Sequence, residues 1–206
     1  SDQLQQQIWA TEQEMLDVIH QVCTEHDLRY SLAYGTLIGA VRHGGFIPWD
    51  DDIDIMMPRE DYEKLIAVWD QSAPKRYILQ NTRTDSDFTQ NFTKIRKDHT
   101  TFLQDEAERT KHYHKGIFVD IFPGDRVPSG KIGRKMQYIA CAVNLLYSRG
   151  HTSGSGGRND KVERVLLKAP KEKYAVRRER AEEKIRSWNV DRCIELWQEA
   201  LDRYYA

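Results

Sequence analysis

The sequence predicts an α/β (α+β) domain followed by a helical C-terminal extension. Residues up to about 125 alternate between helix-like and strand-like patterns, whereas residues from about 131 onward show helical patterns only. A composition of 39% hydrophobic and 31% charged residues is typical of a globular protein with many exposed helices. The length of 206 residues suits one compact domain with an appendage. We therefore expect a catalytic core over residues 1–125 and an extension over residues 126–206 that packs on it.

The first part of the core is expected to contain two helices with a strand between them. Apolar residues at spacings of three, four and seven predict an amphipathic helix over residues 4–26. Residues 28–34 predict a strand that ends at Gly35, and residues 36–43 predict a short helix. The glycines and the proline within residues 44–48 then indicate a turn.

The rest of the core is expected to be mostly strands. Alternating residues predict a strand over residues 51–57, and Pro58 suits the first turn of a helix over residues 59–69. Further strands are expected over residues 77–80, 91–97 and 116–122.

The extension is expected to consist of helices joined by a linker. Helical patterns cover residues 133–148 and 159–169, a charged run continues to Trp188, and a final helix is expected near residues 191–205. The glycine-rich and serine-rich composition of residues 151–160 predicts a flexible linker.

Composition and charge limit the class of protein. No apolar run approaches the roughly 18 residues that a membrane span needs. The three cysteines form no paired motif, which argues against a disulfide framework or a zinc site and favours a reducing, cytoplasmic compartment. Residues 126–186 hold 16 Lys and Arg against 6 Asp and Glu. These basic helices either meet an anionic partner, such as a phosphate-rich polymer or a membrane face, or simply present solvated faces.

An acidic strand carries the strongest chemical signal. Because side chains alternate along a strand, Asp50, Asp52 and Asp54 share one face if the strand begins early enough, while Ile53 and Ile55 take the other. Carboxylates on one face can bind magnesium, and a bound cation would relieve their mutual repulsion. A calcium loop is excluded because its sixth position requires glycine and is Ile55 here. A solvated acidic turn without a role is the remaining alternative, which the apolar opposite face disfavours.

A later strand offers a third acid. Asp120 shares a strand face with Phe118 and Phe122, and a carboxylate between two rings is costly unless it is paired, protonated or metal-bound. Asp125 is the alternative, but it follows a Pro-Gly pair, where a turn role is usual. We expect Asp120 to complete a two-metal site or a site with one metal and a base.

The short helix that precedes the acidic strand is a candidate phosphate site. Gly35 and Thr36 begin this helix directly after a strand, so its first N–H groups can attract phosphate. Arg42 near its end is a candidate phosphate clamp through two parallel hydrogen bonds. His43 suits substrate binding and complementing the helix C-terminus equally well.

Two basic residues on another strand complete the candidate substrate site. Lys94 and Arg96 alternate with a residue between them, so both are expected to reach the same cleft. The sequence contains no Walker motif, kinase glycine loop or dinucleotide fingerprint.

These motifs together resemble the LicD family of bacterial phosphocholine transferases, which is related to the fukutin group. The segments are GTLIGAVRHGGFIPWDDDIDI, then KIR followed by TTF, then GIFVDIFPGD, between about Tyr30 and Asp125. The resemblance implies a nucleotidyltransferase-like mixed sheet flanked by helices. It also implies a magnesium-dependent or manganese-dependent phosphotransferase. This enzyme would move a phosphoalcohol, expected to be phosphocholine, from a CDP-linked donor such as CDP-choline and release CMP. The acceptor would be a hydroxyl of a cell-envelope glycan or glycolipid, as in lipopolysaccharide or teichoic acid modification.

The resemblance also assigns roles to individual residues. It implies that Asp52 and Asp54 bind the metal, that Asp50 is the first acid of the same motif, and that Asp120 is the carboxylate of the later strand. The pair at residues 35–36 matches the glycine turn that contacts phosphate.

Two other functions remain open at this point. The same fold and metals would suit a nucleotidyltransferase that moves a nucleotide from a nucleoside triphosphate to a small molecule or protein. The basic helices would instead suit a non-catalytic module that binds an anionic polymer. No nucleic acid partner is expected. The protein is expected in the cytoplasm, at the inner face of the cell membrane, with peripheral membrane contact through the basic helices.

Overall fold

The computed structural model describes residues 2–103, 106–150 and 158–186. The chain divides into two compact units, Ser1–Pro123 and Gly124–Ala206. The helix expected near residues 191–205 and most of the linker expected over residues 151–160 lie outside the described residues.

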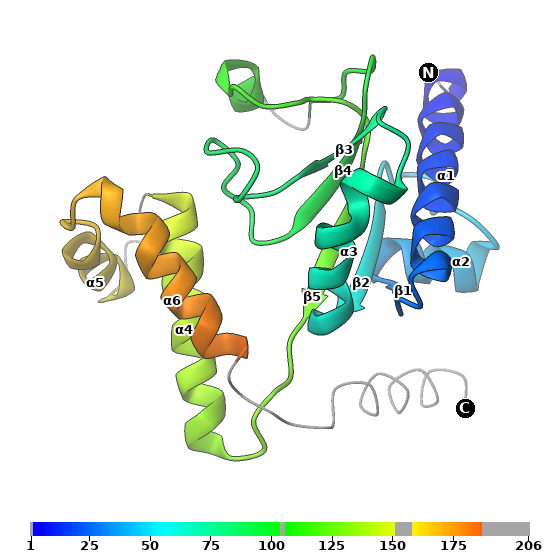
Figure 1. The fold of residues 1–206 in the computed structure, drawn as a ribbon. Helices are drawn as coiled ribbons and strands as arrows, with labels where there is room; N and C mark the ends of the chain where they lie inside the picture. Colours follow the sequence, from blue (N-terminus) through cyan, green and yellow to red (C-terminus); the bar gives the residue numbers. More distant parts are fainter. Residues whose placement is uncertain (1, 104–105, 151–157, 187–206) are drawn as a thin grey trace. The chain divides into compact units, whose positions relative to one another are not determined.

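The first unit is built on a five-stranded mixed sheet (Figure 1). Across the sheet the strands follow the order β1 (Ser31–Leu32), β2 (Ile53–Pro58), β5 (Phe118–Gly124), β4 (Thr93–Lys97) and β3 (Tyr77–Gln80). β1 pairs antiparallel with β2, β4 with β5, and β3 with β4. β2 and β5 are therefore neighbours near the centre of the sheet although they are far apart in the sequence.

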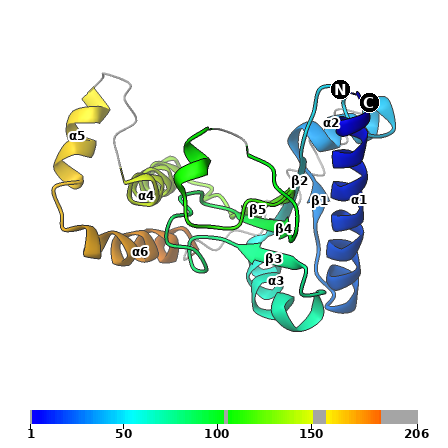
Figure 2. The same cartoon turned by 90° about the horizontal axis from the view of Figure 1, so that it is seen from above.

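Three α-helices surround this sheet, and two of them cover the same face. They are α1 (Asp2–Glu25), α2 (Tyr34–His43) and α3 (Arg59–Ser72), and a short 3₁₀-helix, η1 (Glu106–Thr110), precedes β5. Figure 2 shows α1 and α3 along one side of the strands. The expected α/β architecture is confirmed.

One expected strand is much shorter than the sequence indicated. Residues 28–34 alternate as a strand would, but only Ser31 and Leu32 pair with a neighbour, opposite Met56 and Ile55. The pairing ends there because α2 already begins at Tyr34.

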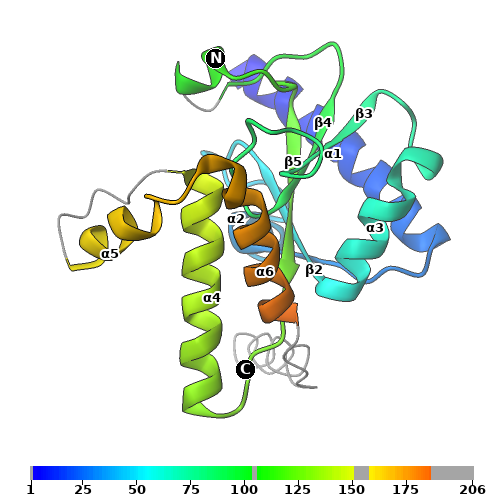
Figure 3. The same cartoon turned by 60° about the vertical axis from the view of Figure 1, so that its left-hand side comes forward.

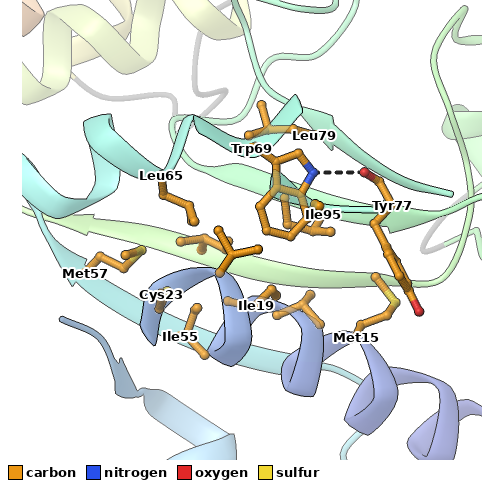
Figure 4. Close-up of a cluster of buried hydrophobic side chains, with 14 of the residues drawn as sticks. Met15, Ile19, Cys23, Ile55, Met57, Leu65, Trp69, Tyr77, Leu79 and Ile95 are labelled. Atoms are coloured by element: carbon orange, nitrogen blue, oxygen red, sulfur yellow. Dashed lines mark hydrogen bonds between the residues drawn. The ribbon is translucent and has the colours of Figure 1, made fainter. Parts of the chain in front are cut away.

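The core of this unit lies between the sheet and the two helices α1 and α3 (Figure 4). Met15, Ile19 and Cys23 of α1 pack with Leu65 and Trp69 of α3 over the strands. Trp69 also donates a hydrogen bond from Nε1 to the carbonyl of Tyr77 at 2.9 Å, which satisfies the one polar group of its ring.

The alternation of β2 and β5 places the acids on the face away from this core. Ile53 and Ile55 of β2, and Val119 and Ile121 of β5, are buried in the core. Because neighbouring side chains point to opposite faces, the intervening aspartates lie on the other side of the sheet. Burial of the apolar residues thus holds the acidic side chains on an ordered surface.

The second unit is helical. It contains α4 (Lys131–Arg149), α5 (Arg158–Leu166), a short 3₁₀-helix η2 (Lys171–Lys173), and α6 (Tyr174–Arg186). α4 and α6 lie side by side (Figure 3). Among the described helices, none is long and apolar enough to cross a membrane.

The longest helix of this unit, α4, has an unusual distribution of side chains. Gln137, Asn144 and Ser148 are buried, and Asn144 donates a hydrogen bond to the carbonyl of Arg178 on α6. In contrast, Ile132 is 82% exposed. Further exposed apolar residues of α4 are Met136, Tyr138, Ile139 and Leu145.

Candidate active site

Three carboxylates, one on β2, one from the residue just before that strand and one on β5, meet on the face of the sheet away from the core. Asp52, Asp54 and Asp120 each offer an oxygen, and these oxygens lie within 4.8 Å of one another. Asp120 is 5% exposed, whereas the other two are half-buried. Oxygen ligands at this spacing fit a hard divalent cation. The alternation of residues in the sequence predicts this grouping of acids, and the structure brings them together.

A second acidic group shares one member with the first. Oxygens of Asp50, Asp51 and Asp52 also lie within 4.8 Å of one another. Asp51 is exposed, so this group is open to water on one side. Asp52 therefore belongs to both groups of carboxylates.

Burial and mutual repulsion change how these acids ionise. Burial raises the pKa of Asp54 to about 7, and the charges of Asp52 and Asp120 add to this effect. Burial also raises the pKa of Asp120 to about 6, although the Lys94 ammonium opposes the rise. A cation bound among these groups would favour their deprotonated forms and lower each pKa.

The two basic residues of β4 are buried and already have partners. Lys94 lies opposite Asp120 in the β4–β5 register, and its Nζ donates to both carboxylate oxygens at 2.7 and 3.0 Å. Arg96 is fully buried, with Nε donating to Oε1 of Gln80 at 2.8 Å and Nη1 donating to the carbonyl of Gly116 at 2.9 Å. The structure thus joins Lys94 to the acid cluster and commits Arg96 to structural hydrogen bonds. A phosphate-binding role for either residue stays a prediction.

The start of α2 is fixed against the acidic strand. A Cβ atom at Gly35 would lie 2.5 Å from Oδ2 of Asp50, so glycine allows this carboxylate to approach the helix. The Thr36 hydroxyl accepts a hydrogen bond from the Asp54 N–H at 2.8 Å. The Asp54 carbonyl in turn accepts one from the Ala33 N–H at 2.9 Å. The expected helix N-terminus and the acids are therefore adjacent.

The end of α2 lies away from that junction. Arg42 and His43 are exposed in its last turn, roughly 10 Å along the helix from Thr36 at 1.5 Å per residue. There they complement the negative end of the helix, which terminates at Gly44 with φ 66°. The structure does not bring these two residues to the acids, and their part in substrate binding stays a prediction.

α1 contributes a further acid, which the sequence motifs did not indicate. Glu12 is 1% exposed, and its Oε2 has no hydrogen-bond partner among the residues that the structure describes. Burial raises its pKa to about 9, and the charges of the aspartates at 50–52 strengthen the shift. A signal was present, because Glu12 lies four residues after Ile8 and three before Met15 on the apolar face of an amphipathic helix.

The same helix holds the loop that carries the first acid. Trp9 Nε1 and Gln5 Nε2 both donate to the carbonyl of Asp50, at 2.8 and 3.1 Å. The Trp9 ring stacks on Phe46, with 5.0 Å between centroids and 10° between planes. α1 therefore positions the acidic segment as well as filling the core.

Comparison with known proteins places this site in a family. A family model described as the LicD/FKTN/FKRP nucleotidyltransferase domain matches residues 27–136, just over half of the chain. The chain belongs to the LicD family. This membership confirms the resemblance seen in the sequence motifs, and the matched residues include the aspartates of both strands but not Glu12.

Three curated proteins show the extent of the similarity. "Lipopolysaccharide cholinephosphotransferase LicD" of Haemophilus influenzae is 37% identical over 116 residues, which cover 56% of this chain and 42% of that protein. An uncharacterised protein of Rickettsia prowazekii is 44% identical over 64 residues, or 31% of this chain and 24% of that protein. An uncharacterised protein of Rickettsia typhi is 50% identical over 42 residues, or 20% and 14%. The chain spans less than half the length of these relatives.

Proposed function

We propose that this LicD-family protein transfers phosphocholine from a CDP-linked donor to a hydroxyl of a cell-envelope glycan and releases CMP. The observation that carries the proposal is the convergence of Asp54 on β2, Asp52 just before it, and Asp120 on β5. The similarity to the lipopolysaccharide cholinephosphotransferase of Haemophilus influenzae supports the choice of cargo and acceptor. The proposal also places the protein at the inner face of the cell membrane. Lysine and arginine residues of α4 lie near its exposed apolar side chains, and this combination suits binding to an anionic membrane surface.

Magnesium, with manganese as an alternative, is part of this proposal. Asp52 and Asp54 would hold the ion, and their oxygens fit it together with that of Asp120. When bound, the ion would neutralise charge on the donor diphosphate and on the leaving CMP. Burial and the charges of the neighbouring aspartates raise the pKa of Asp54, and a bound cation would offset both effects.

Asp120 has two roles open to it, and both require its deprotonated form. It either completes the cation site or accepts the proton of the attacking hydroxyl. The Lys94 ammonium, which donates to both oxygens of Asp120, favours that form in a buried environment. At the start of α2, beside Gly35, the first N–H groups are suited to a donor phosphate.

Replacing Asp54 with asparagine tests the proposal. Transfer of phosphocholine from CDP-choline to a glycan acceptor, followed by mass spectrometry, should fall at least about a hundredfold. Without metal, thermal unfolding should be unchanged or shifted upward, because a repelled and half-buried charge is removed. Asp70→Asn, at an exposed position on α3, is the matched control and should keep full activity. Activity retained by Asp54→Asn would refute the assignment.

Nucleotidyl transfer is the second candidate, because the matching family model is described as a nucleotidyltransferase domain. Thermal shift with CDP-choline, CMP, CTP and ATP, each with magnesium, separates the two. Stabilisation by the cytidine diphosphate ester and CMP supports phosphocholine transfer, whereas stabilisation by ATP alone favours nucleotidyl transfer.

A further inference from the structure

Three aromatic rings from separate segments meet in the first unit. Tyr34 is the first residue of α2, Phe122 lies on β5, and Phe92 immediately precedes β4. The rings of Tyr34 and Phe122 have centroids 5.2 Å apart and planes at 83°, and those of Phe92 and Phe122 are 4.5 Å apart at 40°. Two rings at nearly a right angle can each turn a face toward the same ligand group.

These rings are not explained by the hydrophobic core. Tyr34 is 56% exposed, and Phe92 and Phe122 are half-buried, whereas the nearby Phe88 and Phe118 are buried. Tyr34 also has φ 44°, a left-handed backbone conformation that is costly for a residue other than glycine. An exposed aromatic residue held in such a conformation gains little from burial, and residues of this kind concentrate at binding sites.

Two of these rings, on β5 and at the start of α2, lie close to the acid cluster. Phe122 follows Asp120 by two residues on the same face of β5, about 7 Å along the strand. Tyr34 lies between Ala33, whose N–H donates to the carbonyl of Asp54, and Gly35, which contacts Asp50. A group attached to a phosphate at the acids by a short linker would therefore lie beside these rings.

A cation already lies on aromatic faces in this neighbourhood. Lys94 Nζ is 3.3 Å from the ring centroid of Phe118 and 5.3 Å from that of Phe92. The faces of aromatic rings carry partial negative charge, and they attract cations most strongly where water is excluded. The carboxylates on the same face of the sheet add to the negative potential.

From this arrangement we propose that Tyr34, Phe92 and Phe122 form a subsite for a quaternary ammonium group, the trimethylammonium head of the transferred choline. The inference rests on the proposed function, because the rings can contact this head only if the donor phosphate lies at the acids. A quaternary ammonium group has no N–H to donate, so hydrogen-bond acceptors cannot recognise it. Ring faces and a negative potential attract it without hydrogen bonds.

Calorimetric titration of the magnesium-loaded protein tests the subsite without turnover. The ligands are CDP-choline, CDP-ethanolamine, CMP, and a neutral CDP ester in which carbon replaces the quaternary nitrogen. Wild type should bind CDP-choline about fivefold to thirtyfold more tightly than the neutral ester, which has the same shape. Phe122→Leu and Phe92→Leu should bring this ratio close to one while leaving the affinity for CMP unchanged.

Further variants test whether an aromatic ring is needed at position 34. Tyr34→Phe keeps a ring face and should keep the preference for CDP-choline, whereas Tyr34→Leu should reduce it. Tyr138→Leu, at a 74% exposed position on α4, is the matched control and should bind like wild type. Thermal unfolding of each variant establishes that it is folded before its affinities are compared.

Two results would overturn the subsite. One is equal affinity of wild type for CDP-choline and for its neutral ester, and the other is an unchanged preference in folded Phe122→Leu and Phe92→Leu. If either occurs while CDP-choline and CMP still bind, only the aromatic subsite fails. If wild type binds none of the CDP esters and does not bind CMP, the proposed function fails together with the subsite.

Discussion

Replacing Glu12 with glutamine should stabilise the metal-free protein by an amount that depends on pH. The Glu12 carboxyl is buried and has a pKa of about 9 when folded, against a reference value of 4.5. Near pH 7.5, folding therefore requires this group to take up a proton. The difference of about three pH units from the reference corresponds to about 4 kcal/mol, at roughly 1.4 kcal/mol per unit.

The sign follows from proton binding. The folded protein binds this proton more tightly than the unfolded chain does. Its free energy of unfolding therefore falls as the pH rises from about 4.5 to about 9. Glutamine takes up no proton, so its advantage should shrink to about 1.4 kcal/mol near pH 5.5, one unit above the reference pKa. The protonated carboxyl and the amide have similar shape, and both leave a buried polar group unpaired, so that penalty largely cancels.

Urea unfolding in EDTA, followed by circular dichroism at both pH values, measures the effect. Glu25→Gln, an exposed change on the same helix, is the control and should alter stability by less than about 0.5 kcal/mol. A gain that is equal at the two pH values, or a loss near pH 7.5, would show that folding does not force Glu12 to take up a proton.

Two further changes probe the contacts around the acids. Gly39→Ala should lower the free energy of unfolding by about 1–3 kcal/mol, because its Cβ would lie 2.5 Å from the backbone carbonyl oxygen of Gly45, in the turn that leads to the acidic segment. Gly130→Ala, where a Cβ would meet nothing within 4 Å, is the control in urea unfolding, and equal effects of the two changes would contradict the reasoning. Lys94→Met should cost about 3–5 kcal/mol because it leaves a buried carboxylate unpaired. Adding Asp120→Asn to Lys94→Met should recover most of that loss in the same assay, and a further decrease would contradict this explanation.

Local sequence patterns were sufficient to predict most elements and the main acid cluster. The alternation of aspartate and isoleucine along β2 fixes which face is buried, and Val119 and Ile121 on either side of Asp120 fix its face in the same way. Two strands with acids on corresponding faces bring those acids together once the strands are neighbours. The same local reasoning overestimated β1, because Tyr34 continues the alternation of a strand while its backbone already begins α2.

Features that depend on long-range packing were not predictable in this way. The position of Lys94 opposite Asp120 depends on the register between β4 and β5, which the sequence does not reveal. The burial of Glu12 depends on how α1 rotates against the sheet, because a single acid on an apolar helix face can also lie at its edge. The contact between the rings of Tyr34 and Phe122 forms only when α2 and β5 come together.

The order of the strands also bears on when this protein can become active during its synthesis. β5 is the last strand of the sheet to leave the ribosome, yet it fits between β2 and β4 rather than adding to an edge. A nascent chain that ends before β5 carries Asp54 without Asp120 and has two sheet fragments with unpaired inner edges. The acid cluster therefore forms only when β5 inserts between β2 and β4. Until then, the unpaired edges of β2 and β4 are the part of the chain most open to incorrect strand pairing.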